Sequence, residues 1–169
     1  MSLYAYVNDL SSSAAKEAFQ KCCAAQRWAA QMVQSRPFSS DAEVHQQALS
    51  IWQSLERADY EEAFAGHPQI GADPAALRRK FSTTAEWSKN EQAGVRVASE
   101  ETIQALASLN QQYFERFGYI FIVCASGKSA DEMLGILRGR IGNRPEAELH
   151  IAAAEQHKIT TLRLEKLHL

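Results

Sequence analysis

A helical repeat of apolar residues recurs along most of this chain and limits the folds open to it more than any other feature. It is clearest over residues 99–117, where apolar side chains follow one another at intervals of three or four: Ile103, Leu106, Leu109, Tyr113 and Phe117. This spacing places them on one face of a helix. Gly118, directly after the last of them, is a typical residue to end such a helix.

The same reasoning predicts further helices on both sides. One runs from about residue 14 to 34, where Arg36-Pro37 discourages continuation, and the next begins at Ser40 or Asp41. Another begins at Asp73-Pro74, and a further one runs through Trp87 to about Ala93. The last two run from Ser129, which forms a capping box with Glu132, to near Gly142, and from Pro145 almost to the C-terminus. With 169 residues, no internal repeat and no linker, we expect a single all-α domain over residues 1–169, a bundle of roughly eight helices.

One segment breaks the helical pattern. Residues 119–124, Tyr-Ile-Phe-Ile-Val-Cys, are aromatic and β-branched, which favours extended backbone. A lone strand would have no partner in a helical chain, so we expect a buried extended connector. Its backbone N–H and C=O groups need partners, which are either neighbouring loops or a bound polar ligand.

Charge and composition narrow the classes of partner. The net charge of −2 gives no electrostatic case for binding nucleic acid or an anionic membrane. The longest wholly apolar run, residues 119–125, is far shorter than the ~20 residues of a membrane span. No secretory signal is visible at the start. The three cysteines, Cys22, Cys23 and Cys124, lack Cys-x-x-Cys spacing, so we expect reduced thiols in a cytosol-like compartment.

The motif Gly66-His67-Pro68-Gln69-Ile70-Gly71 places one histidine in a restricted segment between helical regions. Proline pushes the residue before it out of the helical region, and the flanking glycines allow turns. We therefore expect His67 to project from a non-helical link, where its imidazole is suited to acid–base chemistry near neutral pH. An ordinary loop with a capping histidine is the alternative, and this segment alone favours it.

Ser126-Gly127-Lys128-Ser129 resembles part of a phosphate-binding loop because it follows an apolar stretch and precedes a helix. The full pattern also requires a glycine at the position of Ile122, and a parallel sheet that this sequence does not offer. We therefore interpret Gly127-Lys128-Ser129 as a turn and helix cap, and keep nucleotide binding as a minor alternative.

The remaining candidate ligands and nucleophiles are weaker. No metal site is expected, because the spacing of four further histidines matches no ligand motif: His45, His150, His157 and His168. Cys22 and Cys23 lie on an apolar helix face and are more typical of a core than of a nucleophile.

Two charged residues, Arg163 and Glu91, are harder to interpret as solvent-exposed side chains. Arg163 falls on a row of the last helix that we expect to face inward, and a guanidinium there needs an acceptor. Ser88 and Glu91 lie three residues apart on a predicted helix, with Gln92 beside them. An internal Glu91–Arg163 ion pair and a functional site are both open readings.

Five groups of residues, in order along the chain, form one recognisable set: Cys22-Cys23 with Trp28 and Arg36-Pro37-Phe38; Gly66-His67-Pro68-Gln69-Ile70-Gly71; Ser88-Lys89-Asn90-Glu91-Gln92-Ala93-Gly94; Tyr113, Phe117-Gly118 and residues 121–125 with Gly127; and Arg140, Asn143, Glu146 and residues 158–164. Taken together, they resemble the motifs of the 2-oxo-4-hydroxy-4-carboxy-5-ureidoimidazoline (OHCU) decarboxylases of urate degradation, nearly from end to end.

The resemblance implies an all-α enzyme without cofactor or metal. Its substrate would be the unstable imidazoline made from urate by oxidation and hydrolysis, and its products (S)-allantoin and carbon dioxide. The catalytic residues implied are His67, Glu91 and Arg163. The substrate contacts implied are Pro68, Ser88, Glu91, Gln92, Phe121, Ile122, Val123, Cys124, Ala125 and Arg163.

The resemblance also suggests an assembly and a compartment. Members of the family are commonly homodimers, and those of eukaryotes are typically peroxisomal. This chain ends in Leu167-His168-Leu169 rather than Ser-Lys-Leu, which favours a cytoplasmic member.

The chemistry of the substrate fits these residue types. Loss of carbon dioxide leaves an electron pair that the adjacent ring C=N bond can take, so no separate electron sink is needed. His67 would transfer the proton, Glu91 would orient it or bind ureido or hydroxyl groups, and Arg163 would bind a ring or ureido oxygen. Backbone N–H groups of the connector could complete the site. A helical binding module without turnover remains a further alternative.

Overall fold

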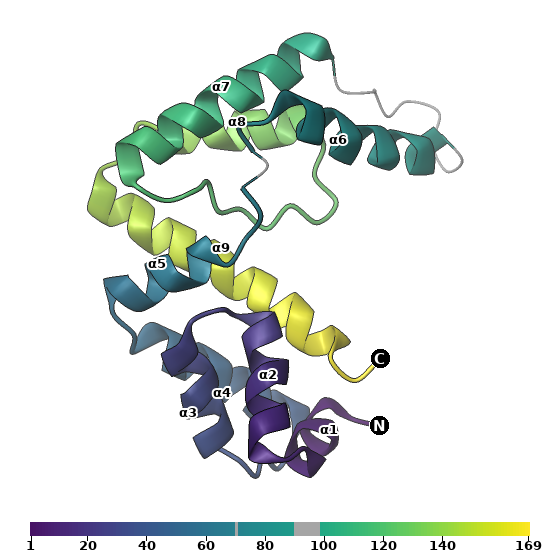
Figure 1. Ribbon diagram of the computed structural model, residues 1–169, viewed down its shortest axis with the longest axis vertical. Helices are drawn as coiled ribbons and strands as arrows, with labels where there is room; N and C mark the ends of the chain where they lie inside the picture. Colours follow the sequence, from purple (N-terminus) through teal and green to yellow (C-terminus); the bar gives the residue numbers. More distant parts are fainter. Residues whose placement is uncertain (70, 90–98) are drawn as a thin grey trace. The chain divides into compact units, whose positions relative to one another are not determined.

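The computed structural model describes residues 1–69, 71–89 and 99–169, with the side chains of 82–89 excepted. These residues form nine helices and no strand (Figure 1). The predicted all-α class is therefore confirmed, with one helix more than the expected eight or so. Within the described residues, no helix is both long and apolar enough to cross a membrane.

The chain divides into two compact units. One comprises Met1–His67 with Ile151–Leu169, and the other comprises Pro68–His150. The last helix, α9 (Pro145–Lys166), contributes its first residues to the second unit and the rest to the first.

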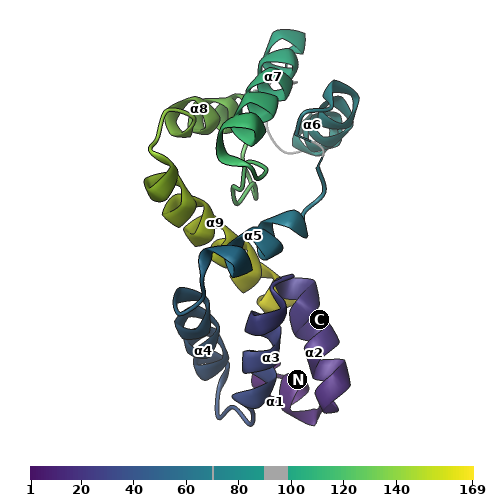
Figure 2. The same ribbon diagram turned by 60° about the vertical axis from the view of Figure 1, so that its left-hand side comes forward.

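The first unit contains five further helices: α1 (Leu3–Asp9), α2 (Ser12–Cys22), α3 (Gln26–Gln34), α4 (Asp41–Gln53) and α5 (Arg57–Ala65). Helices α2 and α3 lie side by side (Figures 1 and 2). Between them the rings of Phe19 and Trp28 meet edge to face, with centroids 6.0 Å apart. The indole N–H of Trp28 donates to the carbonyl of Ala48 in α4 at 3.0 Å, so one buried side chain joins three helices.

The prediction of one helix over residues 14–34 was wrong, because the chain turns between α2 and α3. Cys23 is extended (φ −148°), and its N–H still donates to the carbonyl of Phe19. The alanines that follow favour helix locally, so the break is set by tertiary packing: the turn brings Ala24 against Gly66. Helices α1 and α5 were not predicted.

The second unit contains α6 (Pro74–Lys89), α7 (Glu100–Phe117) and α8 (Ala130–Arg140). Their predicted ends are largely confirmed: Asp73 Oδ1 accepts from the N–H of Ala75, and Ser99 and Ser129 accept from residues three positions on. Gly118 ends α7 in the left-handed region at φ +82°, where glycine avoids the strain that a side chain would cause. The predicted helix from Trp87 to Ala93 corresponds to the end of α6 as far as Lys89, and its remainder lies outside the described residues.

The predicted connector lies between α7 and α8 and is confirmed as non-helical. Tyr119, Ile122 and Val123 are buried. Arg140 holds the segment in place, because its Nη1 donates to the carbonyl of Ile122 at 2.7 Å and its guanidinium lies 4.6 Å from the ring centroid of Phe121.

Arg140 also forms a buried ion pair within this unit. Its Nε lies 2.8 Å from Oε1 of Glu148, which is fully buried. The hydroxyl of Tyr113 donates to the same oxygen at 2.6 Å, and Asn143 Nδ2 donates to Oε2 at 3.0 Å. A buried carboxylate is tolerated when its oxygens are hydrogen-bonded in this way.

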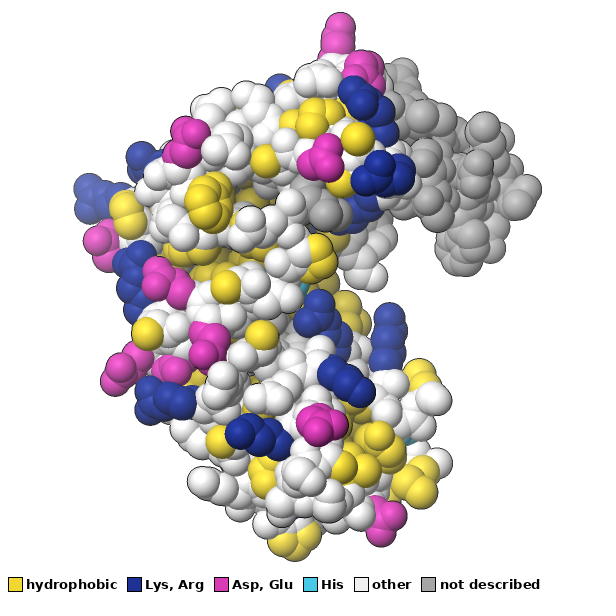
Figure 3. All heavy atoms as spheres, viewed as in Figure 1, with side chains coloured by type: hydrophobic (Ala, Val, Ile, Leu, Met, Phe, Trp, Pro, Cys, Tyr) yellow, Lys and Arg dark blue, Asp and Glu magenta, His cyan; other side chains and the backbone are white. Residues whose placement is uncertain are grey.

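Charged side chains of both signs are interspersed on the face shown in Figure 3. That distribution agrees with the net charge of −2.

Candidate functional site

His67 lies two residues after the last residue of α5, on a bend in the chain where the helix has ended. Gly66 caps the helix with φ −73°, an ordinary helical value, and the proline at position 68 keeps His67 out of the helix. The prediction of a non-helical link is confirmed for His67, Pro68 and Gln69, whereas Ile70 lies outside the described residues.

Gly66 is required for a reason that differs from the predicted one. It does not adopt a positive φ, but a Cβ built on it would lie 2.4 Å from the Cβ of Ala24. The glycine therefore allows the end of α5 to approach the α2–α3 turn closely, and this approach fixes where His67 leaves the helix.

Helix α9 supplies the partner of His67. The Nε2 atom of His67 lies 2.5 Å from Oε1 of Gln156, a buried side chain with 1% of its surface exposed. The amide nitrogen of Gln156 donates to Thr160 Oγ1 at 3.2 Å, and Thr160 is 2% exposed. Because these residues are four apart on one helix, a continuous polar row reaches from the interior to the imidazole.

The surroundings lower the pKa of His67. Burial disfavours the imidazolium most strongly, and the positive charge of Arg163 acts in the same direction, while the hydrogen bond to Gln156 acts against both. With its pKa below the ordinary value, His67 is predominantly neutral at pH 7.

The prediction that Arg163 lies on the buried row of α9 was wrong. The buried row is Glu148, Ala152, Gln156, Thr160 and Leu164. Arg163 lies beside this row and is exposed. Its Nη1 donates to the carbonyl of Cys22, the last residue of α2. At 3.5 Å this is a long hydrogen bond. Glu91, the other member of the ion pair that was one of the two open readings, lies outside the described residues.

Cys22 and Cys23 complete these surroundings and are core residues, as predicted. Both are fully buried. Burial raises the pKa of Cys22 to about 12 and that of Cys23 to about 11, although Arg163 lowers both in part. Such thiols remain protonated and unreactive at neutral pH.

The other predicted site residues belong to the second unit or lie outside the described residues. Pro68 is exposed. In the connector, Ile122 and Val123 are buried, while Phe121, Cys124 and Ala125 are half-buried. Ser88 lies in α6 with its side chain undescribed, and Glu91 and Gln92 fall within residues 90–98, which the structure does not describe. The structure thus brings together His67 and Arg163 around Gln156, Thr160 and the two thiols.

The turn after the connector behaves as predicted. Lys128 Nζ donates to the carbonyl of Cys124 at 2.7 Å, and Gly127 adopts φ +73°. Ser129 Oγ accepts from the N–H of Glu132 and caps α8. These bonds engage the lysine and serine that a phosphate-binding loop would direct at a nucleotide.

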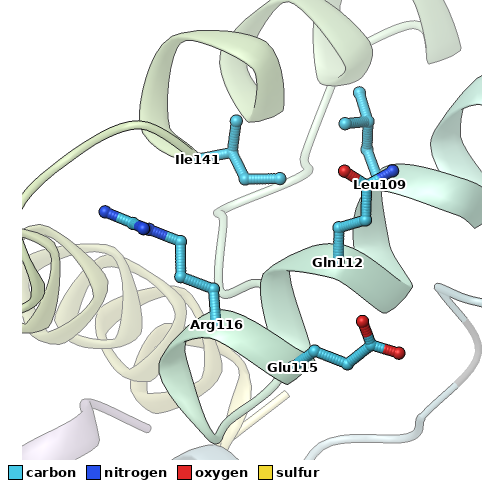
Figure 4. Close-up of a pocket in the computed structure, with 5 residues that line it drawn as sticks. All are labelled: Leu109, Gln112, Glu115, Arg116 and Ile141. Carbon is cyan, nitrogen blue, oxygen red and sulfur yellow. The ribbon is translucent and has the colours of Figure 1, made fainter.

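An open hollow on the second unit is lined by Leu109, Gln112, Glu115, Arg116 and Ile141 (Figure 4). Its polar side chains point in different directions rather than converging on one point, and none of the predicted site residues lies among them. We therefore assign it no role in the chemistry.

Gln156 and Thr160 are the residues of this site whose role the sequence did not reveal. The available signal was a glutamine and a threonine four residues apart on the apolar side of a helix. Buried polar groups of that kind need hydrogen-bond partners, and a nearby loop histidine is a candidate.

Comparison with known proteins gives a consistent result. The family model described as OHCU decarboxylase matches residues 8–165. The chain is 41% identical over 155 residues to the uric acid degradation bifunctional protein TTL of Arabidopsis thaliana, covering 90% of this chain but only 47% of that protein. It is 32% identical to the 2-oxo-4-hydroxy-4-carboxy-5-ureidoimidazoline decarboxylase of Amia calva, covering 82% of this chain and 78% of that one.

A solved structure agrees with these sequence matches. The crystal structure of an OHCU decarboxylase in the presence of (S)-allantoin superposes with a TM-score of 0.72 at 38% identity. The match covers 90% of this chain and 96% of that chain.

Proposed function

This chain belongs to the OHCU decarboxylase family, and from that membership we propose that it decarboxylates 2-oxo-4-hydroxy-4-carboxy-5-ureidoimidazoline to (S)-allantoin and carbon dioxide in urate degradation. The observation that carries the proposal is the family match over residues 8–165, a range that includes His67.

His67 is the proposed proton-transfer residue. The carboxylate leaves as carbon dioxide, its electron pair forms a C4=C5 bond, and the C5=N electrons move to the ring nitrogen, which takes a proton from water. The resulting enol becomes a ketone when its hydroxyl proton is removed and C5 is protonated on one face. A half-buried histidine that is neutral at pH 7 is suited to accept the proton of the enol hydroxyl and to deliver it to C5.

The other site residues are proposed from the family resemblance. Glu91 would orient His67 or accept hydrogen bonds from the ureido or hydroxyl groups, and Arg163 would bind a ring or ureido oxygen. Further substrate contacts would be Pro68, Ser88, Gln92, Phe121, Ile122, Val123, Cys124 and Ala125. Contacts that strengthen as negative charge moves into the ring accelerate the reaction, whereas a clamp on the departing carboxylate would not.

We also propose that residues 1–169 act as one functional domain, as a cytoplasmic homodimer. The domain proposal is supported by the span of the family match. The compartment is supported by the sequence, in which the cysteines are odd in number and lack Cys-x-x-Cys spacing. The homodimer rests on the family resemblance alone.

The test is to generate the unstable substrate in situ, by enzymatic oxidation of urate and hydrolysis of the product, and to follow the circular dichroism of the allantoin formed. With this protein, optically active (S)-allantoin should accumulate faster than in its absence, where slow chemical decay gives a racemate. A protein that leaves both rate and optical activity unchanged would overturn the proposal.

Calorimetric titration separates the two other function classes. Binding of allantoin without any turnover would indicate a helical binding module. Tight binding of ATP would revive the reading of Gly127-Lys128-Ser129 as a nucleotide site.

A further inference from the structure

The row formed by His67, Gln156 and Thr160 has an order of donors and acceptors that can be assigned from its own geometry. Thr160 Oγ1 lies 3.0 Å from the backbone carbonyl of Gln156, one turn back in α9. Threonine in a helix commonly donates its single hydroxyl proton to that carbonyl. Once this proton is committed, Oγ1 can only accept, both from the Gln156 amide and from the neutral Cys23 thiol that is hydrogen-bonded to it.

This assignment fixes the orientation of the Gln156 amide. Its –NH2 group must face Thr160, which accepts at 3.2 Å, and its oxygen must face His67. An amide oxygen is an acceptor only, so the Nε2 of His67 has to carry a proton in order to donate to it across 2.5 Å. In a neutral imidazole the other nitrogen, Nδ1, then holds the lone pair.

We propose that Gln156 is a positioning residue that holds neutral His67 in its Nε2–H tautomer, so that Nδ1 is the atom that exchanges protons with the substrate. The inference rests on the proposed function for its catalytic part, whereas the tautomer itself is independent of turnover. Among the described residues, none donates a hydrogen bond to Nδ1.

In this arrangement the His67 ring returns to its starting protonation state in each turnover. Nδ1 accepts the proton of the substrate hydroxyl, giving an imidazolium whose Nε2–H still donates to Gln156. The Nδ1–H bond then breaks as a C–H bond forms at C5, and the neutral Nε2–H tautomer is restored. One further proton, taken up from water at the ring nitrogen, balances the loss of the carboxylate as carbon dioxide.

Among the described residues, Arg163 on α9 is the charged group that acts on His67, and it also acts on the Cys22 and Cys23 thiols at the end of α2. Glu62 lies on α5. Glu62 accepts from the N–H of Gln26 at 2.6 Å and acts on Cys23. Arg163 disfavours the imidazolium. The partner that holds the ring is a neutral amide, which selects a tautomer without raising the pKa as strongly as a carboxylate would.

Nitrogen-15 NMR of the imidazole ring tests the tautomer directly. The shifts of the two ring nitrogens distinguish a protonated from a lone-pair nitrogen, and the His67→Gln variant identifies the His67 signals. Above its pKa, wild-type His67 should show a protonated Nε2 and a lone pair on Nδ1. In Gln156→Met, which removes the acceptor, the signals should move towards a mixture of tautomers.

Kinetics test the catalytic consequence. Gln156→Met should lower kcat by about ten- to a hundredfold with a smaller change in KM, because a wrongly protonated imidazole cannot take the proton at Nδ1. Gln156→Glu keeps an acceptor for Nε2–H, so it should retain the tautomer and more of the activity. It should also move the acid limb of the pH profile upward, since the carboxylate favours the imidazolium.

A threonine pair supplies the matched control. Thr160→Val removes the acceptor for the Gln156 amide and should weaken the tautomer preference. Thr161→Val makes the same change one residue on, where the hydroxyl lies 3.5 Å from His157 instead, and should leave the His67 spectrum and kcat unchanged. Melting temperatures report whether each variant is folded.

The outcomes are decisive in either direction. A lone pair on Nε2 in the wild type, or an unchanged tautomer and kcat in folded Gln156→Met, would overturn the proposal. If the wild-type protein forms no allantoin at all, the proposed function fails, but the NMR result still decides whether Gln156 fixes the ring.

Discussion

At the scale of single residues, His67 joins two properties that general acid–base catalysis requires. Its pKa is lowered, so the neutral ring that can accept a proton predominates at pH 7. Its orientation is set by a hydrogen bond to a buried side chain, so its position does not depend on the substrate. A surface histidine would have an ordinary pKa and no fixed geometry.

Replacing His67 by alanine should therefore affect rate far more than stability. Turnover should fall by about a hundred- to ten-thousandfold. Unfolding free energy should fall by no more than about 1–3 kcal/mol, the cost of leaving the Gln156 oxygen with only water. His150→Ala, at an exposed histidine of α9, is the control and should retain both. Near wild-type turnover in His67→Ala would exclude this histidine as the proton-transfer group.

The lowered pKa of His67 also determines the direction in which kcat/KM and stability change with pH. As pH falls through the folded-state pKa, which lies below about 6.5, the ring becomes an imidazolium and loses the lone pair that accepts a proton. The profile of kcat/KM should have an acid limb with its midpoint below about 6.5. The unfolded chain binds that proton at higher pH, so the contribution of His67 to stability is also present above this value and lost in acid. A midpoint of the acid limb above about 6.5 would contradict the burial that lowers the pKa of His67.

At the scale of elements, α9 shows why its buried face was hard to predict. The buried row contains the polar residues Glu148, Gln156 and Thr160. A hydropathy pattern treats such residues as exposed. The predicted inward row therefore followed the buried row only through Ala152 and Gln156 and then left it for Ile159 and Arg163. Each buried polar group has a partner, which a sequence pattern does not show: Arg140, His67 or the helix carbonyl.

The close approach at the end of α5 predicts a steric cost for a single methyl group. Gly66→Ala would place a Cβ 2.4 Å from that of Ala24, so one of the two segments must move, at a cost of about 1–3 kcal/mol. The control is Gly142→Ala, where a Cβ meets nothing within 4 Å. Urea denaturation of both variants measures the difference, and equal stabilities would show that the turn yields easily.

The ion pair beneath the connector predicts a larger loss. Arg140→Met leaves the buried carboxylate of Glu148 without its cation and should cost roughly 3–5 kcal/mol. Adding Glu148→Leu removes that charge and should recover part of the loss, although Tyr113 and Asn143 then lack an acceptor. Arg116→Met is the control, because Arg116 makes an exposed bond to a carbonyl. Additive losses in the double mutant would show that the pair is not coupled.

At the scale of the whole molecule, the distribution of ligating side chains gives a prediction about metals. No group of three or more histidine, cysteine or acidic residues that could hold an ion occurs in the described ranges, and the substrate carries its own electron sink. Dialysis against a chelator should leave activity unchanged, with no stoichiometric metal found by elemental analysis. Activity lost on chelation and restored by zinc or manganese would contradict a metal-free mechanism.

Features that depend on local sequence could be predicted, whereas those that depend on distant contacts could not. The ends of α7 follow from Ser99 and Gly118, and the position of His67 outside a helix follows from Pro68. The turn after Cys23 places Ala24 close to Gly66, far along the chain, and the partner of His67 lies 89 residues away. The one-domain organisation and the roles of Glu91, Gln92 and Ser88 remain predictions.

The burial of Cys22 and Cys23 determines how readily these two thiols are oxidised during storage. Peroxide and related oxidants attack the thiolate rather than the thiol. With pKa values of about 12 and about 11, almost none of either sulfur is ionised at neutral pH. The surroundings of His67 therefore resist sulfenic acid formation through burial alone, and enzyme stored without a reductant should keep these two side chains chemically intact.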